Sequence, residues 1–410
     1  MKNRFLDELE SRGFLNQCTD KKKLEEICDK KSVNGYIGFD CTASSLHVGS
    51  LLQIMFLRLM QKHGHRPIVL LGGGTTLIGD PSGKDSTRKI LNEKEIKKNI
   101  NSIKKVFNKI LDTSNRNTKP IFVNNSKWLN KLNYIEFLRN IGTHFTINKM
   151  LTFDSVKLRL EREQSLSYME FNYMILQAYD FYQLYKKNNC ILQIGGSDQW
   201  GNIVNGVDLI KRFSGNQAYG LTTPLITLAS GAKMGKTETG AIWLDEKYLS
   251  PYDYWQFWRN IDDRDVFKFL NFFTDLSAEK IDKIKDEDIN HQKIILANET
   301  TSMLHGKSAA KKSEETAKKT FSENSLGSAL PSISLRKEQI QNNFTIIDLI
   351  IMSKLETSKS EIRRLIKGNG VKINNKTIDN EKLIINQGLF KENIIKLSLG
   401  KKRHIKVEFI

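Results

Sequence analysis

The sequence predicts an α/β protein, in which a doubly wound parallel sheet is followed by an α-helical domain and a small α+β domain. Short apolar runs that end in glycine occupy residues 35–39 (GYIGF) and 67–74 (PIVLLGGG), and a helical pattern at 51–62 lies between them. A third such run, 190–195 (CILQIG), follows a helical pattern at 167–187. Strands that alternate with helices are typical of a parallel sheet.

The domain boundaries follow from shifts in pattern along the chain. We expect the sheet domain to span 1–246, with 126–165 as an insertion or an interface. Helical patterns dominate the next part, which gives a helical domain at 247–325. The Ser-, Gly- and Pro-containing stretch NSLGSALPSISL then predicts a linker at 326–343. The last domain, 344–410, has a helix pair and short strands separated by the turns KGNG and INNK.

The length and composition of the chain indicate its cellular compartment and the absence of a metal site. With 410 residues, the chain is too long for one ordinary core. It has no run of about eighteen apolar residues that could span a membrane, and its first residues, MKNRFLDELESRGFLNQ, lack the apolar segment of an export signal. Its four cysteines form no CxxC pair and show no metal-ligand spacing. We therefore expect a cytoplasmic protein with free thiols, no membrane partner and no protein-bound metal.

The net charge of +18 suggests a polyanionic partner, most often nucleic acid. The last domain is enriched in this charge, because 344–410 contain 14 Lys and Arg against 7 Asp and Glu. One predicted helix there brings together four cations that could bind RNA phosphates: Lys359, Arg363, Arg364 and Lys367. The alternative is a coding bias toward lysine, with these residues on a solvated helix face.

Two common phosphate-binding motifs are excluded. The stretch GGGTTLIG has Leu77 where the dinucleotide pattern GxGxxG needs its third glycine. The stretch IGDPSGKDS has Ile78 in place of the first P-loop glycine, and Asp85 in place of the Ser or Thr that follows the lysine. If the chain binds ATP, it uses another phosphate-binding motif.

The segment His47-Val48-Gly49 is a candidate for such a motif. It follows the first strand and opens the next helix, where backbone N–H groups and the helix dipole attract phosphate. Gly49 would let a flat base or a phosphate approach the backbone, and His47 could donate to a phosphate oxygen. The alternative is an ordinary helix start, with Ser44 or Ser45 as the cap.

The Gly-rich loop ASGAKMGKTETG contains Lys233 and Lys236. Two lysines three residues apart on such a loop can act as a mobile clamp for pyrophosphate, although a KxxK in a basic protein is more often only an exposed loop. Their order after the upstream His-x-Gly makes the pair specific.

A polar stripe lies on the helical run YMEFNYMILQAYDFYQLY. Tyr173, Gln177 and Asp180 fall at i, i+4 and i+7 on one face. The other faces are apolar, which predicts a buried helix. A buried polar stripe needs partners, which are either other protein groups or a ligand with an ammonium group and a polar tip.

Five ordered runs of the sequence match a known family: YIGFDCTASSLHVGSL, LIGDPSGKDSTR, NYMILQAYD, QIGGSDQWGN and KMGKT. On these runs the chain resembles the bacterial-type tyrosyl-tRNA synthetases over its whole length, and 344–410 resemble an S4 RNA-binding domain. The resemblance implies a Rossmann-like catalytic domain that carries the two signature motifs of class I aminoacyl-tRNA synthetases.

The resemblance also implies roles for individual residues. The phenolic hydroxyl of tyrosine would be bound by Tyr36 and Asp180. The ammonium group would be held by Asp80, Tyr173 and Gln177, with Gln199 near the carboxylate. ATP would lie against Gly38, Asp40, His47, Gly49, Ser50, Gly195, Asp198, Lys233, Met234 and Lys236, with Asp198 on a ribose hydroxyl. The catalytic set that neutralises the β- and γ-phosphates would be Thr42, His47, Lys84, Arg88, Lys233 and Lys236.

One position departs from the family pattern. Ser50 stands where the first motif often has a second histidine. A hydroxyl can still contact ribose, so we expect an altered affinity and intact chemistry.

The implied reaction is the ATP-dependent activation of L-tyrosine to tyrosyl-adenylate and its transfer to the 3′ end of tRNA(Tyr). ATP would bring Mg²⁺, the helical domain would face the anticodon end of the tRNA, and the chain would form a homodimer through 126–165. One alternative is a tryptophanyl-type synthetase, whose indole substrate has no hydroxyl to match Tyr36 and Asp180. The other is a non-catalytic, synthetase-like RNA-binding protein, which would have no use for a pyrophosphate clamp.

Overall fold

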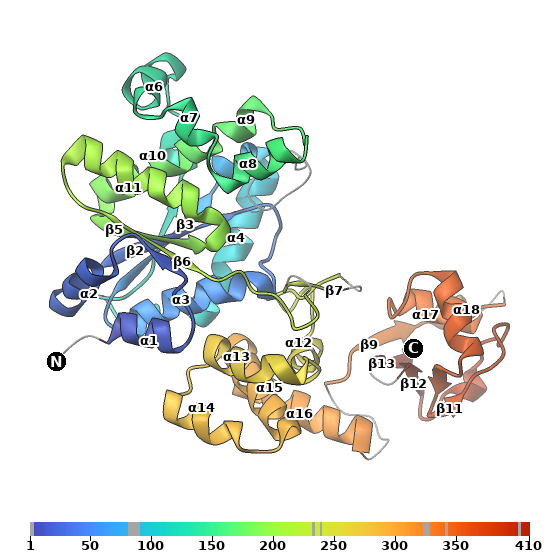
Figure 1. Ribbon diagram of the computed structural model, residues 1–410. Coiled ribbons are helices and arrows are strands. Elements are labelled where there is room, and N and C mark those ends of the chain that lie inside the picture. Colours follow the sequence, from blue (N-terminus) through green and yellow to red (C-terminus); the bar gives the residue numbers. More distant parts are fainter. Residues whose placement is uncertain are drawn as a thin grey trace. The chain divides into compact units, whose positions relative to one another are not determined.

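A computed structural model describes residues 4–80, 91–231, 234–237, 240–322, 329–340, 343–400 and 403–410 (Figure 1). The chain divides into two compact units. The first comprises Met1–Tyr248 and Ile261–Gln292, and the second comprises Leu249–Asn260 and Lys293–Ile410. The predicted helical domain at 247–325 is therefore divided between the two units.

A six-stranded sheet forms the centre of the first unit, in the order β1-β6-β5-β2-β3-β4. Its neighbouring strands are parallel, except that the short edge strand β1 runs antiparallel to β6. The doubly wound parallel sheet predicted from the sequence is confirmed, and the three predicted strands are β2, β3 and β5. The strands are β1 (Gln17–Cys18), β2 (Asn34–Asp40), β3 (Arg66–Gly72), β4 (Ile121–Asn124), β5 (Cys190–Gly196) and β6 (Tyr219–Thr223).

Helices cover both faces of this sheet (Figure 1). On one face, α3 (Leu51–Lys62) packs on β2 and β3. On the other, α10 (Tyr173–Asn188) and α11 (Trp200–Ser214) pack against each other and on β5. Helix α3 is apolar on most of its surface because α1, α4 and α13 cover the side that faces away from the sheet.

The other helices of this unit are α1 (Phe5–Ser11), α2 (Lys21–Lys30), α4 (Glu93–Ile110), α5 (Ser126–Leu129), α6 (Tyr134–Asn140), α7 (Ile147–Met150), α8 (Asp154–Glu161), α9 (Tyr168–Phe171), α13 (Asp263–Phe273) and α14 (Ala278–Lys285).

The first helix ties residues 261–292 to the sheet unit. Arg12 is buried and pairs with Glu8 at 2.8 Å. Its guanidinium also donates to three carbonyl oxygens at the end of α13 and in the loop after it, at 3.0, 3.1 and 2.5 Å: those of Asn271, Thr274 and Leu276. These contacts explain why α13 and α14 belong to the first unit, although their helical pattern resembles that of the segment beyond them.

The second unit contains a helical part and a small sheet. Its helices are α12 (Pro251–Arg259), α15 (Ile289–His305, from Lys293 onward), α16 (Lys307–Ser322), α17 (Ile346–Met352) and α18 (Lys359–Lys367). The sheet has the order β11-β10-β12-β13-β9. Its strands are β9 (Ser332–Leu335), β10 (Val371–Ile373), β11 (Lys376–Thr377), β12 (Ile394–Leu399) and β13 (Arg403–Phe409).

The structure differs from the predicted linker at 326–343. Within that range, β9 pairs in parallel with β13, and Leu335 lies opposite Phe409. Leu335 is fully buried in the core that α17 and α18 build on the small sheet. The serines of this stretch suggested a linker, whereas the alternating Ile333 and Leu335 make it a strand.

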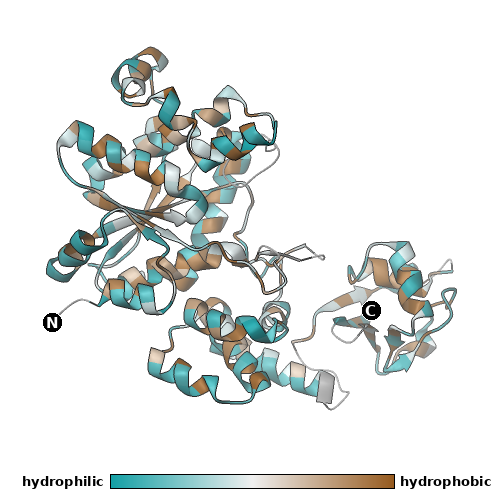
Figure 2. Cartoon of the chain, viewed as in Figure 1, coloured by the Kyte–Doolittle hydropathy of each residue, from teal (hydrophilic) through white to brown (hydrophobic). Residues whose placement is uncertain are grey.

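Apolar residues, brown in Figure 2, gather along the strands of the central sheet, and hydrophilic residues cover the outer sides of the helices. Among the described residues, no helix combines the length and the apolar character that a membrane crossing requires.

Candidate functional site

A cavity of about 390 Å³ opens at the carboxyl ends of β2, β3 and β5. Strand β3 lies on one side of β2 and β5 on the other, and such a switch point is where ligands bind in open α/β sheets. The cavity brings together most residues that the sequence predicted for tyrosine and ATP: Tyr36, Gly38, Asp40, Thr42, His47, Gly49, Ser50, Asp80, Tyr173, Gln177, Asp180, Gly195, Asp198 and Gln199.

Some predicted phosphate-binding residues cannot be placed in this cavity. Lys84, Arg88 and Lys233 lie outside the described residues. The backbone of Lys236 begins β7 (Lys236–Thr237), which pairs with β8 (Gly240–Ala241). Met234 is buried, and its carbonyl oxygen lies against Gly49.

His47 caps the short helical turn Val48–Ser50 that leads into α3. Its Nδ1 accepts the N–H of Gly49 at 3.0 Å, so a neutral ring carries its hydrogen on Nε2. The serines upstream do not cap this helix: Ser44 Oγ pairs with Tyr248 Oη at 2.5 Å, and Ser45 Oγ accepts from the N–H of Asp245. The side chain of His47 itself makes the helix start.

The two predicted ATP motifs, far apart in the sequence, are in contact. The chain just after the second motif packs on the first: the N–H of Val48 donates to the carbonyl oxygen of Ile242 at 2.8 Å, and the rings of His47 and Trp243 pack edge to face at 6.5 Å. A methyl group on Gly49 would lie 2.6 Å from the carbonyl oxygen of Met234, and one on Gly235 would lie 2.6 Å from Nδ1 of His47. Both positions therefore require glycine for close approach, and Gly235 also has a φ of +115°.

Asp180 is the most deeply buried carboxylate of the cavity, with 1% of its surface exposed. Asn125 Nδ2 donates to Oδ2 at 2.8 Å, and Trp128 Nε1 donates to Oδ1 at 2.7 Å. Burial raises the pKa of Asp180 to about 7, and these two hydrogen bonds oppose the rise. The carboxyl group can therefore change its charge near neutral pH.

Tyr36 lies in the same part of the cavity and is 1% exposed. Its hydroxyl has no hydrogen-bond partner in the described structure. Burial, followed by the charge of Asp180, raises the pKa of Tyr36 well above its ordinary value. The ring packs on Phe181 at 5.3 Å. A buried hydroxyl without a partner is costly, so this part of the cavity is suited to a ligand with a polar tip.

A chain of amides occupies another wall of the cavity. Gln199 Nε2 donates to Asp80 Oδ2 at 2.9 Å, and Gln177 Nε2 lies 3.3 Å from Gln199 Oε1. Behind them, Asn202 Nδ2 donates to the Oε1 atoms of both glutamines at 3.1 Å. Tyr173 Oη donates to Asp40 Oδ1 at 3.4 Å. This wall offers oxygen acceptors to a cationic group.

Sequence reasoning missed three buried residues of the site: Asn125, Trp128 and Asn202. The first two support Asp180, although Trp128 falls in the range 126–165 that was assigned to an insertion or interface. Each of the three could have been suspected only from its position in the chain. Asn125 and Trp128 follow the end of the edge strand β4, and Asn202 lies three residues after Gln199.

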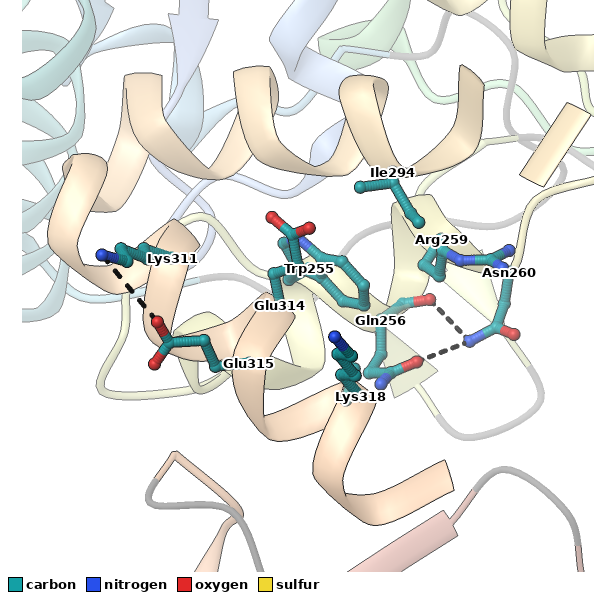
Figure 3. Close-up of a pocket in the computed structure, with 10 residues that line it drawn as sticks. Trp255, Gln256, Arg259, Asn260, Ile294, Lys311, Glu314, Glu315 and Lys318 are labelled. Atoms are coloured by element: carbon teal, nitrogen blue, oxygen red, sulfur yellow. Dashed lines mark hydrogen bonds and ion pairs between the residues drawn. The ribbon is translucent and has the colours of Figure 1, made fainter. Parts of the chain in front are cut away.

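A second cavity, of about 610 Å³, lies in the second unit between α12, α15 and α16 (Figure 3). Figure 3 shows amide and charged side chains of both signs around it. Asn260 donates to the side chain of Gln256 at 3.0 Å, and Lys311 pairs with Glu315 at 3.9 Å. Arg259 and Lys318 also line this cavity.

The four cations predicted to bind RNA all lie on α18 of the second unit, and all are exposed. Arg364 pairs with Glu361 at 2.8 Å, and Arg363 lies 3.5 Å from Glu381. The opposite side of the helix buries Ile362 and Ile366 in the core of the small domain. The helix therefore presents its basic face to solvent.

Comparisons with known proteins agree with this site. A family model described as tRNA synthetases class I (W and Y) matches residues 29–322. The tyrosine–tRNA ligase of Pelagibacter ubique (strain HTCC1062) is 69% identical over 408 residues, and the match covers 100% of both chains. The tyrosine–tRNA ligase of Rickettsia massiliae (strain Mtu5) is 52% identical, and the match covers 98% of this chain and 99% of that one.

A solved structure gives the same result. The C-terminally truncated mitochondrial tyrosyl-tRNA synthetase of Aspergillus nidulans superposes with a TM-score of 0.70 at 32% identity, and the match covers 77% of this chain and 94% of that one. The family model spans most of the chain, and the curated relatives match it from end to end. The chain therefore belongs to the class I tRNA synthetases, among the tyrosine–tRNA ligases.

Proposed function

We propose that the 390 Å³ cavity binds L-tyrosine beside ATP and carries out the first step of tyrosine–tRNA ligation. The chain activates tyrosine with ATP and charges tRNA with it. What remains to be assigned is which residues hold each part of the substrates, how the tRNA is bound, and whether two chains act together.

The buried pair Tyr36 and Asp180 is the observation that carries this assignment. The Asp180 carboxylate can accept a hydrogen bond from a phenolic O–H, and the unpaired Tyr36 hydroxyl can donate to the same phenolic oxygen. Phenylalanine would leave both buried groups without a partner, which a site of this kind rejects strongly. The pair therefore selects a substrate with a hydroxyl at the end of its ring.

The ammonium group of tyrosine fits the amide wall. Asp80 supplies a carboxylate, and Gln177 and Tyr173 supply neutral oxygens on the same side of the cavity. Gln199, bonded to Asp80, lies where the substrate carboxylate would be steered. The ring hydroxyl and the ammonium group are thus bound at separate places, which fixes the substrate carboxylate toward the nucleotide.

Catalysis then needs positioning and charge stabilisation more than proton transfer. The substrate carboxylate is itself the nucleophile, so it attacks the α-phosphorus of ATP in line and pyrophosphate leaves. His47, with its hydrogen on Nε2, can donate to the leaving phosphates. We assign the same role to Thr42, Lys84, Arg88, Lys233 and Lys236, and the ribose to Asp198 and Ser50. The arrival of Mg²⁺ with ATP and a cytoplasmic location stay predictions from the sequence.

Tryptophan is disfavoured as the substrate by the same pair of buried groups. An indole has a donor but no hydroxyl oxygen to accept from Tyr36, so the Tyr36 hydroxyl would stay unpaired. A non-catalytic role is disfavoured because a protein that only binds RNA has no use for a cavity with a carboxylate at one end and a phosphate-binding histidine at the other.

We propose that two chains pair through the segment 126–165 and the adjoining Tyr168. Large apolar side chains are exposed there: Tyr134 (59%), Ile135 (63%), Ile147 (59%) and Tyr168 (66%), with Leu151, Leu158 and Leu160 also exposed. Monomeric proteins seldom expose apolar patches of this kind, and a second copy of the same chain is the most common cover.

For tRNA, we propose that α18 contacts the phosphate backbone as part of an S4-like domain. Its exposed cations can each neutralise a phosphate. The larger cavity in Figure 3 supports an anticodon-side role for the helical part of the second unit, because its volume suits an unstacked base. Asn260 Oδ1 can accept from the edge of such a base, and the second hydrogen of Gln256 Nε2 can donate to it.

Amino-acid-dependent pyrophosphate–ATP exchange tests the substrate. We expect exchange with tyrosine and none above background with phenylalanine or tryptophan. Asp180→Ala should lower kcat/KM for tyrosine about 10- to 100-fold, because it removes a hydrogen bond to a charged group. Exchange driven by tryptophan would overturn the assignment of Tyr36 and Asp180, and no exchange at all in protein that binds tRNA would favour the non-catalytic alternative.

The affinity for tyrosine should depend on pH through Asp180. In the unliganded protein burial raises its pKa to about 7, so the group is protonated below that pH. A phenolic hydroxyl that donates to the carboxylate favours the ionised form and lowers the pKa in the complex. Affinity should therefore rise with pH, by at most about tenfold per unit, and level off above about 7. Fluorescence titration between pH 5.5 and 8.5 checks this, and Asp180→Asn should give a flat profile.

Light scattering after gel filtration tests the pairing of chains. The wild-type protein should have twice the chain mass, and Ile135→Glu should shift it toward the single-chain mass, because a charge would be buried in the interface. Phe267→Glu, at an exposed apolar position on α13, is the control and should leave the mass unchanged. A single-chain mass for the wild type across micromolar concentrations would refute the proposal.

Charge removal on α18 tests tRNA binding. The double variant Arg364→Ala/Lys367→Ala should raise the KM for tRNA several-fold and reduce the salt dependence of binding by about two phosphate contacts. Pyrophosphate exchange should not change, because it needs no tRNA. The control Lys382→Ala/Lys391→Ala removes the same charge from other exposed positions of the domain. Equal effects of both pairs would mean that only net charge matters.

A further inference from the structure

Asn202 lies on the first turn of α11, behind the amide wall of the first cavity. It is 4% exposed and is not among the residues that line the cavity. Its Nδ2 donates to Gln177 Oε1 and to Gln199 Oε1, both at 3.1 Å. An amide nitrogen carries two hydrogens, so both donors of Asn202 are directed at the two glutamines.

These bonds decide how each glutamine is oriented. The oxygen and the nitrogen of a glutamine amide have nearly the same size, so packing alone does not distinguish them. Because Asn202 presents only hydrogens to them, the two carbonyl oxygens turn toward it. The nitrogen of Gln199 is then free to donate to Asp80 Oδ2 at 2.9 Å. The whole chain of amides has one direction, which Asp80 fixes at Gln199 and Asn202 fixes from behind at both glutamines.

The direction matters for a cationic substrate group. Gln177 Oε1 has two lone pairs and can accept from Asn202 and from an ammonium group together. If the amide turned over, its N–H groups would face the ammonium, and two donors cannot pair. Without the hydrogen bonds from Asn202, the reversed orientation of the Gln177 amide would become populated.

We infer that Asn202 is a positioning residue for the substrate's ammonium group, which acts by holding the amide orientation of Gln177 and Gln199. This inference rests on the proposed binding of the ammonium group by Asp80, Tyr173 and Gln177. Asn202 does not touch the substrate in this arrangement.

A second asparagine on the same helix provides a matched control. Asn205 is also 4% exposed, but its Nδ2 has no hydrogen-bond partner among the described residues. Both positions therefore bury an amide on α11. They differ because the Asn202 amide donates to Gln177 and Gln199, whereas the Asn205 amide nitrogen does not.

The test uses two ligands that differ only in the amino group: L-tyrosinol and 3-(4-hydroxyphenyl)propan-1-ol. The ratio of their Kd values measures the contribution of the ammonium group. Asn202→Leu keeps the branched shape of the side chain and removes both donors. We expect it to weaken tyrosinol about 5- to 10-fold and to leave the amine-free alcohol within about twofold. Asn202→Ala should change the ratio in the same direction, and Asn205→Leu should leave it unchanged.

Equal weakening of both ligands by Asn202→Leu and Asn202→Ala would overturn the inference, since a merely structural residue would act on the whole site. Gln177→Ala distinguishes the proposed ammonium site from the positioning role of Asn202. If Gln177→Ala changes the ratio and the Asn202 variants do not, the positioning role is wrong while the ammonium site stands. If Gln177→Ala does not change the ratio either, the ammonium site itself is misplaced and the inference fails with it.

Discussion

The cavity depends on a carboxylate that has been taken out of water. Burying Asp180 is costly unless donors surround it, and its two donors come from the segment that follows β4. Asn125 is itself held in place, because its Oδ1 accepts the N–H of Gly74 at 2.8 Å and its Nδ2 donates to Thr75 as well as to Asp180. The end of β3, the end of β4 and helix α10 are thus fixed relative to one another by the need to solvate one charge with protein groups. A substrate's polar tip enters surroundings that are already arranged.

The sequence was most informative where the signal is local. Apolar runs punctuated by glycine predicted β2, β3 and β5, and the spacing of Tyr173, Gln177 and Asp180 predicted one polar helix face that the structure places in the cavity. It was least informative about groups that matter only through long-range contacts. An asparagine such as Asn125 suggests a cap or a turn when it is read from the sequence, and nothing around Trp128 indicates that its indole is aimed at a carboxylate on α10. The same limit applies to domain boundaries: helical periodicity cannot show that Arg12 holds α13 to the first unit.

Hydrogen bonds fix the orientation of a histidine and of two glutamines in this site. His47 carries its hydrogen on Nε2 because its Nδ1 accepts from the N–H of Gly49, and the side-chain oxygens of Gln177 and Gln199 are held by the two hydrogens of Asn202. In both cases a hydrogen bond to a neighbouring protein group decides the orientation of a side chain that lines the cavity. The residues that line a cavity can be recognised from a motif, whereas the groups that set their direction are found only when the fold brings them together.

The close approach of Gly49 and Gly235 limits which substitutions this protein can accept in evolution. A side chain at either position would collide with the other motif, with Met234 in one case and His47 in the other. Neither glycine can be replaced alone. The obstructing atoms are the backbone oxygen of Met234 and the ring of His47, so a substitution at the other glycine would not make room for a side chain. Two distant stretches of the gene are therefore under one shared constraint, while the exposed helices around them are open to substitution.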